Sequence, residues 1–367
     1  MTPPDQFRYD GYAIDRGTGR VRCTYLAGAH SFTEEFGFPP GPGWDDPAAE
    51  AAVRILFLLA GVSYYKTAAA SVVDLGDLPS TPAERAFLKT FLVHGLGEFA
   101  HRNGLDLRDV TVTGPEDAAA GPVAYGPDAD RPLIPFGGGI DSIVTADAVA
   151  RTHAGAALCI VHPPADRFAA IEDAAAVTGL PVTRVTRQID PLVRRSDELG
   201  FLNGHVPVTA IITAAAVVAA VLEDRDAVVL SNERSASVPT LVADGVAVNH
   251  QWSKGAAFER AFAELLRDRL GPALAVFSYL RPRSELWVAR QFAGLTAYHG
   301  AFRSCNRAFR QDPAARLDHW CGECDKCCFI DLVLAPFMEA ADLAAVFGGH
   351  EPLADPDNED RFRTLLG

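Results

Sequence analysis

The sequence predicts an α/β protein with a parallel β-sheet core, a smaller α+β domain before it and a C-terminal region that carries a cysteine cluster. Two observations support this fold class. From residue 132 onward, short apolar runs alternate with helical patterns, which is typical of a parallel sheet covered by helices on both faces. In the first of these units, a strand-like stretch meets three glycines and then an apolar-periodic segment, as expected of a strand, a loop and a helix N-terminus.

The smaller α+β domain is expected at residues 1–115. Residues 7–38 alternate between polar and apolar side chains and are rich in turn residues, which predicts a small antiparallel sheet. Helical patterns follow at 47–60 and 81–103, and the second ends in Asn103-Gly104, a plausible helix C-cap.

Acidic residues, glycine and proline dominate residues 116–131, which are predicted to form a linker. The α/β core is expected at 132–255, and a helical C-terminal region with the cysteines at 256–367. Within the core, the predicted strands are 133–136, 157–162, 182–185 and 227–230, and the predicted helices are 141–152, 167–178 and 207–223.

Composition limits the functional classes that fit. The chain has 367 residues, with 33 basic against 47 acidic side chains and a net charge of −14, so we expect no nucleic-acid partner. Residues 206–222 are uncharged but rich in alanine and threonine, which favours a buried helix over a membrane span. The first residues lack the basic and apolar start of a signal peptide, so a cytoplasmic location is expected.

The three glycines suit phosphate binding. Glycine lets backbone amides approach a ligand closely, and the N–H groups and dipole at a helix N-terminus attract anions. In a parallel sheet, ligands bind beyond the carboxyl ends of the strands, where the segment after the strand at 227–230 also falls. The expected nucleotide-binding residues are Gly137, Gly138, Gly139, Asp141, Ser142, Ser231 and Asn232.

Three cysteines in the run Cys321-Gly-Glu-Cys324-Asp-Lys-Cys327 have the spacing of a metal-binding knuckle, and Cys305 lies sixteen positions upstream. Four thiolates around Zn²⁺ form a closed structural site with no open position for catalysis. The pattern therefore predicts a structural zinc ion held by these four residues.

Two alternatives to this ligand set stay open. His319 is an alternative fourth ligand, whereas Cys328 directly follows a ligand and is expected to be a spare core residue. An iron–sulfur cluster held by three cysteines is the rival metal group.

The glycine run resembles the PP-loop, Ser-Gly-Gly-x-Asp-Ser, of enzymes that split ATP into AMP and pyrophosphate. The match covers Gly138, Gly139, Asp141 and Ser142. It departs from the pattern at Gly137, where the family usually has serine, and the loop contains no lysine.

Further segments resemble the UDP-N-acetylmuramoyl-L-alanyl-L-glutamate epimerase family (the MurL type), from about residue 7 to about residue 340. They are Gly61-Val-Ser-Tyr-Tyr-Lys66, Val93-His-Gly-Leu-Gly-Glu-Phe99, Asn203-Gly-His-Val-Pro-Val-Thr209, Ser231-Asn-Glu-Arg-Ser-Ala-Ser237, Val248-Asn-His-Gln-Trp-Ser-Lys254, Trp320-Cys-Gly-Glu-Cys-Asp-Lys-Cys327 and Leu334-Ala-Pro-Phe337. The resemblance implies an ATP- and Mg²⁺-dependent inversion of the terminal L-glutamate of this UDP-muramyl dipeptide, a peptidoglycan precursor.

The chemistry of such an inversion explains why ATP would be needed. Removing the α-proton beside an ionised carboxylate would place two negative charges side by side, whereas an acyl-adenylate cancels the first charge and accepts the second. Hydrolysis would then release AMP and the inverted product. Residues near the strand ends that could act as bases or donors are His205, Glu233, His250 and Lys254.

Two other functions fit parts of the pattern. One is a PP-loop enzyme that adenylates a nucleoside or tRNA, which the acidic charge opposes. The other is a nucleotide-binding regulator without catalysis, made plausible by the two departures from the PP-loop. The sequence makes no prediction of oligomeric state.

Overall fold

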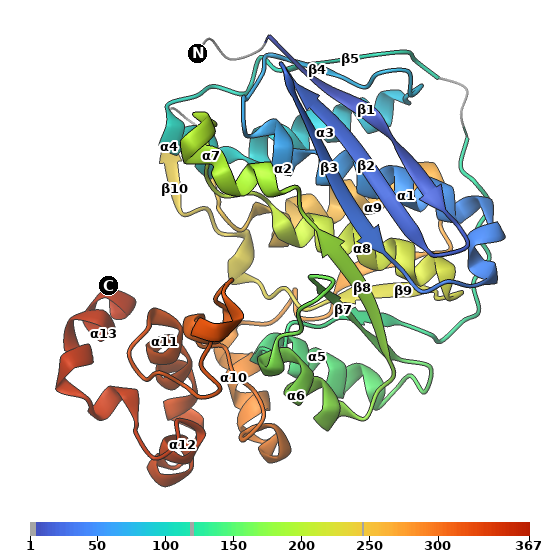
Figure 1. Ribbon diagram of the computed structural model, residues 1–367. Coiled ribbons are helices and arrows are strands. Elements are labelled where there is room, and N and C mark those ends of the chain that lie inside the picture. The colour runs from blue at the N-terminus through green and yellow to red at the C-terminus, as the bar shows by residue number, and fades with distance from the viewer. Residues whose placement is uncertain (1–4, 118–120, 244–245) are drawn as a thin grey trace.

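The computed structural model describes residues 5–117, 121–243 and 246–367, and its centre is a ten-stranded sheet in the order β12-β9-β6-β7-β8-β3-β2-β1-β4-β5 (Figure 1). The strands of this sheet are β1 (Gln6–Asp15), β2 (Arg20–Ala27), β3 (His30–Gly37), β4 (Val72–Asp74), β5 (Thr111–Thr113), β6 (Leu133–Pro135), β7 (Ala157–His162), β8 (Val182–Gln188), β9 (Ala227–Leu230) and β12 (Ala275–Ser278). The α-helices are α1 (Pro47–Ala60), α2 (Val62–Tyr65), α3 (Pro82–Gly95), α4 (Gly97–Asn103), α5 (Ile140–Ala150), α6 (Ala169–Thr178), α7 (Ser196–Leu199), α8 (Val208–Leu222), α9 (Ala256–Leu270), α10 (Glu285–Ala293), α11 (Asp325–Leu334), α12 (Ala340–Val346) and α13 (Glu359–Leu366). A separate two-stranded sheet consists of β10 (Leu241–Ala243) and β11 (Val246–Val248).

The strands β12, β9, β6, β7 and β8 run parallel. Successive side chains of a strand point to opposite faces, so a sheet covered on both sides needs apolar residues at every position. In β7, Ala157 and Cys159 join the core on one face, whereas Leu158 and Ile160 join the core on the other. The continuous apolar runs in the sequence follow from this double burial.

Helices cover both faces of the parallel strands (Figure 1). Residues of α1, α8 and α9 form one core with the sheet, and residues of α5, α6 and α10 form the other. The predicted α/β class is therefore confirmed. The strands β7 and β9 have the expected bounds, and β8 continues to Gln188, beyond the predicted end.

The antiparallel sheet expected at residues 7–38 forms as β1, β2 and β3, but it is continuous with the parallel strands. β3 pairs antiparallel with β8, where Glu35 lies opposite Gln188. The burial of these strands alternates, because helices such as α1 cover only one of their faces. The division at residues 115 and 131 stays a prediction, and one sheet extends across it.

Two expected elements differ from the structure. The helix predicted at 81–103 is divided into α3 and α4 by a break at Leu96, between two glycines that favour helix poorly. At Gly95 a Cβ atom would lie 3.1 Å from the ring of Pro207, so close packing favours glycine there. The predicted C-cap at Gly104 forms, with a left-handed φ of 64°.

The region expected to be helical after residue 256 also contains a strand. β12 pairs in parallel with β9 at the edge of the sheet, and α9 packs against the same core as α1 and α3. A strand of four residues at an edge carries too little pattern to be recognised in the sequence.

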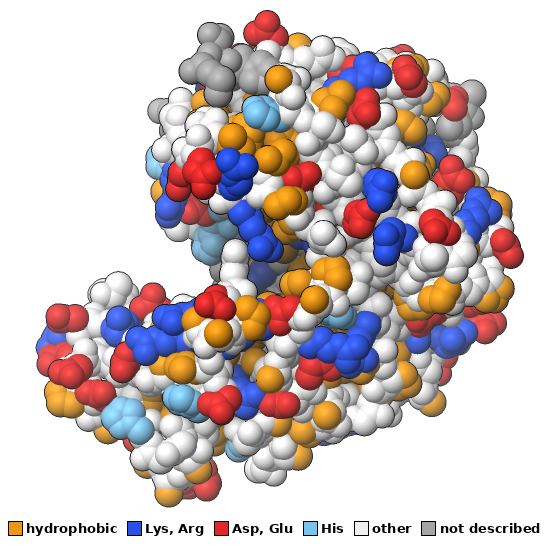
Figure 2. Space-filling view, in the orientation of Figure 1, with side chains coloured by type: hydrophobic (Ala, Val, Ile, Leu, Met, Phe, Trp, Pro, Cys, Tyr) orange, Lys and Arg blue, Asp and Glu red, His pale blue; other side chains and the backbone are white. Residues whose placement is uncertain are grey.

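Among the residues that the structure describes, one apolar segment, Pro47–Tyr65, is long enough to cross a membrane, but 94% of its most apolar window is buried inside the fold. This burial is that of a core helix. On the surface, Figure 2 shows that the molecule is hollowed between the sheet and the C-terminal helices, and basic and histidine side chains lie at the hollow.

Buried Glu84 links the helices α1, α3 and α9. Its carboxylate accepts hydrogen bonds from Nε and Nη2 of Arg54 in α1, at 2.6 and 3.1 Å, and lies 3.5 Å from Nε of Arg269 in α9. It also completes a capping box with Thr81 at the start of α3.

We therefore expect Glu84→Gln to lower the free energy of unfolding by about 3–5 kcal/mol, because it leaves buried arginine charge without its partner. The matched control is Glu359→Gln, which removes the exposed partner of Arg363 in α13 and should leave that free energy almost unchanged. Urea unfolding of both variants measures the difference. Equal stabilities would show that the three-helix junction does not depend on this ion pair.

Candidate active site

A pocket of about 510 Å³ lies at the carboxyl ends of the parallel strands, as expected of this fold. Its walls include the segment after β6, the middle of β7, and Ser231 and Asn232 after β9. It is also lined by Ser304, Asn306 and Lys326 from the C-terminal part of the chain. The pocket thus lies between the sheet and the segments that carry the cysteines.

The glycine loop, residues 137–139, turns between β6 and α5. Gly138 has a left-handed φ of 74°, and a Cβ atom there would lie 2.7 Å from the carbonyl oxygen of Ala170 in α6. Both conditions require glycine. At Gly137, by contrast, a Cβ atom would meet no atom within 4 Å, so packing does not explain why serine is missing from this position.

The N-terminus of α5 opens toward the same pocket. Its N-cap is Gly139, which has no side chain to bond the first free N–H groups of the helix. The hydroxyl of Ser142 lines the pocket and donates a hydrogen bond to the Gly139 carbonyl oxygen at 3.0 Å. This arrangement provides amide groups and a positive dipole end for an anion.

Asp141 is the most perturbed acid of the pocket. Its pKa is raised to about 7, mainly by burial and in part by the nearby charge of Glu233. Lys254 and Lys326 act in the opposite direction. Burial also raises the pKa of Glu285, again with Glu233 as a contributing neighbour. Several acids therefore lie near two lysines, an arrangement that a bound cation would stabilise.

The segment after β9 is hydrogen-bonded to β12, the edge strand that the sequence analysis did not predict. The backbone N–H of Asn232 donates to Oγ of Ser278 in β12 at 2.6 Å, and that hydroxyl lies 2.6 Å from the Asn232 carbonyl oxygen. Ser231 is different, because its buried hydroxyl has no hydrogen-bond partner among the described residues. An unpartnered hydroxyl on a pocket wall is a group that a polar ligand would satisfy.

The four residues expected to transfer protons are not equally placed. Lys254 lines the pocket, and buried Glu233 directly follows the pocket residue Asn232 and accepts a hydrogen bond from the Ser235 hydroxyl at 2.7 Å. His205 and His250 do not line this pocket, but their rings lie 6.2 Å apart.

The histidine pair is electrostatically connected to the pocket through Lys254. Partial burial lowers the pKa of His205, and the charges of His250 and Lys254 act in the same direction. Buried Lys66 secures the preceding residues, because its Nζ donates to the side-chain oxygen of Asn203 at 2.6 Å. The lowered pKa of His205 favours the neutral form of its ring.

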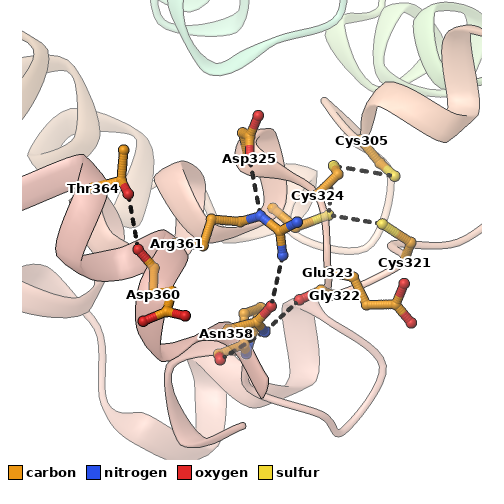
Figure 3. A network of polar contacts seen from close by, with 12 residues as sticks. Cys305, Cys321, Gly322, Glu323, Cys324, Asp325, Asn358, Asp360, Arg361 and Thr364 are labelled. Atoms are coloured by element: carbon orange, nitrogen blue, oxygen red, sulfur yellow. Dashed lines mark hydrogen bonds and ion pairs between the residues drawn. The ribbon is translucent and has the colours of Figure 1, made fainter. Parts of the chain in front are cut away.

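The four predicted metal ligands converge, and Figure 3 labels three of them, Cys305, Cys321 and Cys324. The Sγ atoms of Cys305, Cys321, Cys324 and Cys327 all lie within 4.8 Å of one another, the one such ligand group within residues 5–117, 121–243 and 246–367. Individual Sγ–Sγ distances are 3.5, 3.7 and 4.0 Å. The group could hold a metal ion.

The alternatives for this site take other positions. His319 is exposed and pairs with Asp318, and Cys328 is buried outside the group. The C-terminal helix α13 and its N-cap residue contact the cysteine-bearing segment (Figure 3). Arg361 of α13 forms an ion pair with Asp325, and the N-cap Asn358 donates a hydrogen bond to the Gly322 carbonyl oxygen.

Sequence reasoning missed the contribution of the C-terminal part to the pocket. Ser304 and Asn306 flank Cys305, and Lys326 lies between two other cysteines of the group. The rarity of lysine, with only four in the chain, was the one signal that could have drawn attention to Lys326.

Comparisons with known proteins agree with this architecture. A model of the MurL N-terminal domain matches residues 1–279, and a model of the MurL C-terminal domain matches residues 301–367. Proteins named UDP-N-acetyl-alpha-D-muramoyl-L-alanyl-L-glutamate epimerase are similar along most of their length. The relative from Salinispora tropica is 39% identical over 99% of this chain and 80% of its own length. The relative from Xanthomonas oryzae is 38% identical, over 93% and 76%, and that from a Micromonospora species is 38% identical, over 99% and 81%. The chain therefore belongs to the MurL family.

Proposed function

We propose that this protein inverts the terminal L-glutamate of UDP-N-acetylmuramoyl-L-alanyl-L-glutamate in peptidoglycan precursor synthesis, and that it consumes ATP to do so. The names of its relatives supply the substrate and the reaction. The observation that best supports ATP use is the pocket itself, where the glycine loop, the open N-terminus of α5 and Lys254 line one cavity.

ATP enters the proposal as a co-substrate. An oxygen of the glutamate α-carboxylate attacks the α-phosphorus, an O–P bond forms, and pyrophosphate leaves. A base then removes the α-proton, and a proton added to the opposite face inverts the centre. Water cleaves the acyl-adenylate into AMP and the D-glutamyl product. The reaction requires no oxidant or reductant.

Different residues of the pocket suit different parts of this reaction. The amides of Gly137 and Gly139 and the hydroxyl of Ser142 suit the phosphates. The unpartnered hydroxyl of Ser231 suits a further polar group of the nucleotide. Lys254 supplies positive charge where carboxyl and phosphate charges meet.

Asp141 is the proposed Mg²⁺ ligand. Its raised pKa marks an acid whose charge lacks enough compensation, so the donor set fits a hard cation with oxygen ligands. Bound Mg²⁺ would neutralise phosphate charge and favour departure of pyrophosphate.

His205 is the proposed base, because its lowered pKa favours the unprotonated ring, which can accept a proton. His250 lies beside it on another loop, and we propose that it takes part in the returning proton transfer. A substrate that reaches from the pocket past Lys254 would bring its glutamate to this pair.

The cysteine group is the proposed structural Zn²⁺ site. Regular tetrahedral coordination with Zn–S bonds of about 2.3 Å places sulfur atoms about 3.8 Å apart, which agrees with the three Sγ–Sγ distances. A [4Fe–4S] cluster held by three cysteines binds each thiolate to a different iron and therefore needs these sulfurs farther apart.

Formation of AMP distinguishes the proposed function from its alternatives. The purified protein is incubated with ATP, Mg²⁺ and either the UDP-muramyl dipeptide, RNA or a deazapurine nucleoside. The epimerase proposal requires AMP only with the dipeptide. AMP formed only with RNA or the nucleoside would instead indicate a modification enzyme, and ATP binding without AMP would indicate a regulator.

Asp141→Asn should abolish AMP formation and yet stabilise the protein without ligands. Asp141 has a pKa of about 7 in the fold against about 3.9 when unfolded, so the wild type loses stability as pH rises through this window. The variant should therefore melt roughly 2–4 °C higher at pH 8, with no such gain at pH 4. Asp109→Asn, at an exposed site, is the control for both measurements. Wild-type turnover in the Asp141 variant would remove this residue from the mechanism.

Lys254→Ala should lower the rate by on the order of 10²–10³ because it removes an electrostatic stabiliser. Lys254→Arg should restore little, since the guanidinium is larger and planar. Deuterium exchange at the glutamate α-carbon separates the possible roles, because AMP formation without exchange identifies proton transfer and loss of both identifies adenylation. Lys89→Ala, an exposed lysine of α3, should retain the wild-type rate. The proposed role is wrong if Lys254→Ala matches this control.

Cys324→Ser should lower metal content and melting temperature together, because metal binding energy is folding energy at a closed site. Elemental analysis of the wild type should give about one zinc per chain. Cys328→Ala also loses a buried thiol but lies outside the group, so it should retain the metal. Iron with visible absorbance would contradict the zinc proposal.

A further inference from the structure

The cysteine group and the nucleotide pocket share their chain segments. Ser304 and Asn306, which line the pocket, are the neighbours of the ligand Cys305. Lys326 also lines the pocket. It is the second residue of α11 and lies between the ligands Cys324 and Cys327 in the sequence. Any ion held by the cysteines therefore fixes the backbone of one pocket wall.

This wall packs directly against the glycine loop. A Cβ atom at Gly139 would lie 3.4 Å from Oγ of Ser304, which is van der Waals contact. Arg303, the preceding residue, forms an ion pair with Asp173 of α6. The loop thus meets α6 on one side and the cysteine-bearing segment on the other.

A second ion pair fastens the same wall. Arg316 donates two hydrogen bonds to the carboxylate of Asp166, each at 2.6 Å, and its guanidinium lies 4.0 Å from the ring centre of Phe168. Bidentate pairs of this kind set orientation as well as distance. The wall is therefore attached to the sheet domain at two places.

Lys326 adds a positive charge to the pocket, and among the described residues no carboxylate pairs with it. Its side chain is exposed, and it forms no ion pair with any residue in the described ranges. Its Nζ lies 5.4 Å from the ring centre of Phe329, a weak contact for an ammonium group. It also influences Asp141 and Glu285, which places its charge at the acidic centre of the pocket.

We propose that Lys326 is a phosphate-binding residue for the nucleotide, held in place by the metal ion of the cysteine group, so that metal occupancy sets nucleotide affinity. The proposal rests on the proposed function, because it needs ATP in this pocket. Lys326 would also provide the positive charge that the glycine loop lacks, although it lies almost two hundred positions away from the loop in the sequence.

Binding of ATP and of AMP to wild type and to Lys326→Gln provides the test, by calorimetry with Mg²⁺ and without the dipeptide. A charge-assisted hydrogen bond corresponds to a loss of about ten- to a hundredfold in affinity. An ammonium group acts as a point charge, so ATP should be weakened more than AMP. Lys89→Gln removes an equal charge from the exposed surface of α3 and should bind both nucleotides as the wild type does.

Metal content separates loss of charge from loss of structure. Lys326→Gln should retain the wild-type metal content and melting temperature, since it changes no ligand. Cys324→Ser, measured below its melting temperature, should bind ATP as weakly as Lys326→Gln. The double variant should be little weaker than either single one, because both changes act through the same contact.

The outcomes separate the two proposals. If the wild type does not bind ATP, the proposed function fails. If the wild type binds ATP and Lys326→Gln binds it equally well, the role of Lys326 is wrong while the proposed function stands. Additive losses in the double variant would show that the metal acts on the nucleotide by a route other than Lys326.

Discussion

A steric constraint at Gly138 determines how the site is assembled. The backbone of Gly138 has a left-handed conformation, and the carbonyl oxygen of Ala170 occupies the space that a side chain would need. This contact fixes the turn between β6 and α5 and directs the N-terminus of α5 toward the carboxyl edge of the sheet. The next residue, Gly139, lies against Ser304, so the same turn also determines how closely the C-terminal part approaches. The loop, α6 and the cysteine-bearing segment consequently form one packed unit.

The electrostatic character of the pocket follows from this packing. Three acids, Asp141, Glu233 and Glu285, lie within electrostatic reach of one another, and burial opposes ionisation of the first and the last. The two lysines that offset them come from distant segments, Lys254 after β11 and Lys326 on α11. Such a concentration of partly desolvated charge is unfavourable to the empty protein and is typical of functional sites. Phosphate and a divalent cation together would supply the charges that this arrangement lacks.

The sequence predicts those parts of the structure that local pattern determines. The parallel strands are apolar throughout because helices cover both faces, so β7 and β9 have the expected bounds. The cysteine group was predictable because ligand spacing carries its own chemical meaning. β12 was not predictable, since four residues at a sheet edge have no distinctive period, yet its Ser278 holds Asn232 in position. The separation of His205 and His250 from the pocket depends on the course of two loops, which no local pattern records.

The most direct test of the account is whether exchange of the glutamate α-proton requires cleavage of ATP between its α- and β-phosphates. The wild-type protein is incubated in ²H₂O with Mg²⁺ and the UDP-muramyl dipeptide, and the recovered dipeptide is examined by mass spectrometry and ¹H NMR. With ATP, the account predicts one deuterium at the glutamate α-carbon together with stoichiometric AMP. With α,β-methylene-ATP, which fills the pocket but cannot release pyrophosphate, it predicts neither. Deuterium incorporation with the analogue, or without any nucleotide, would contradict activation of the carboxylate as the step that makes inversion possible.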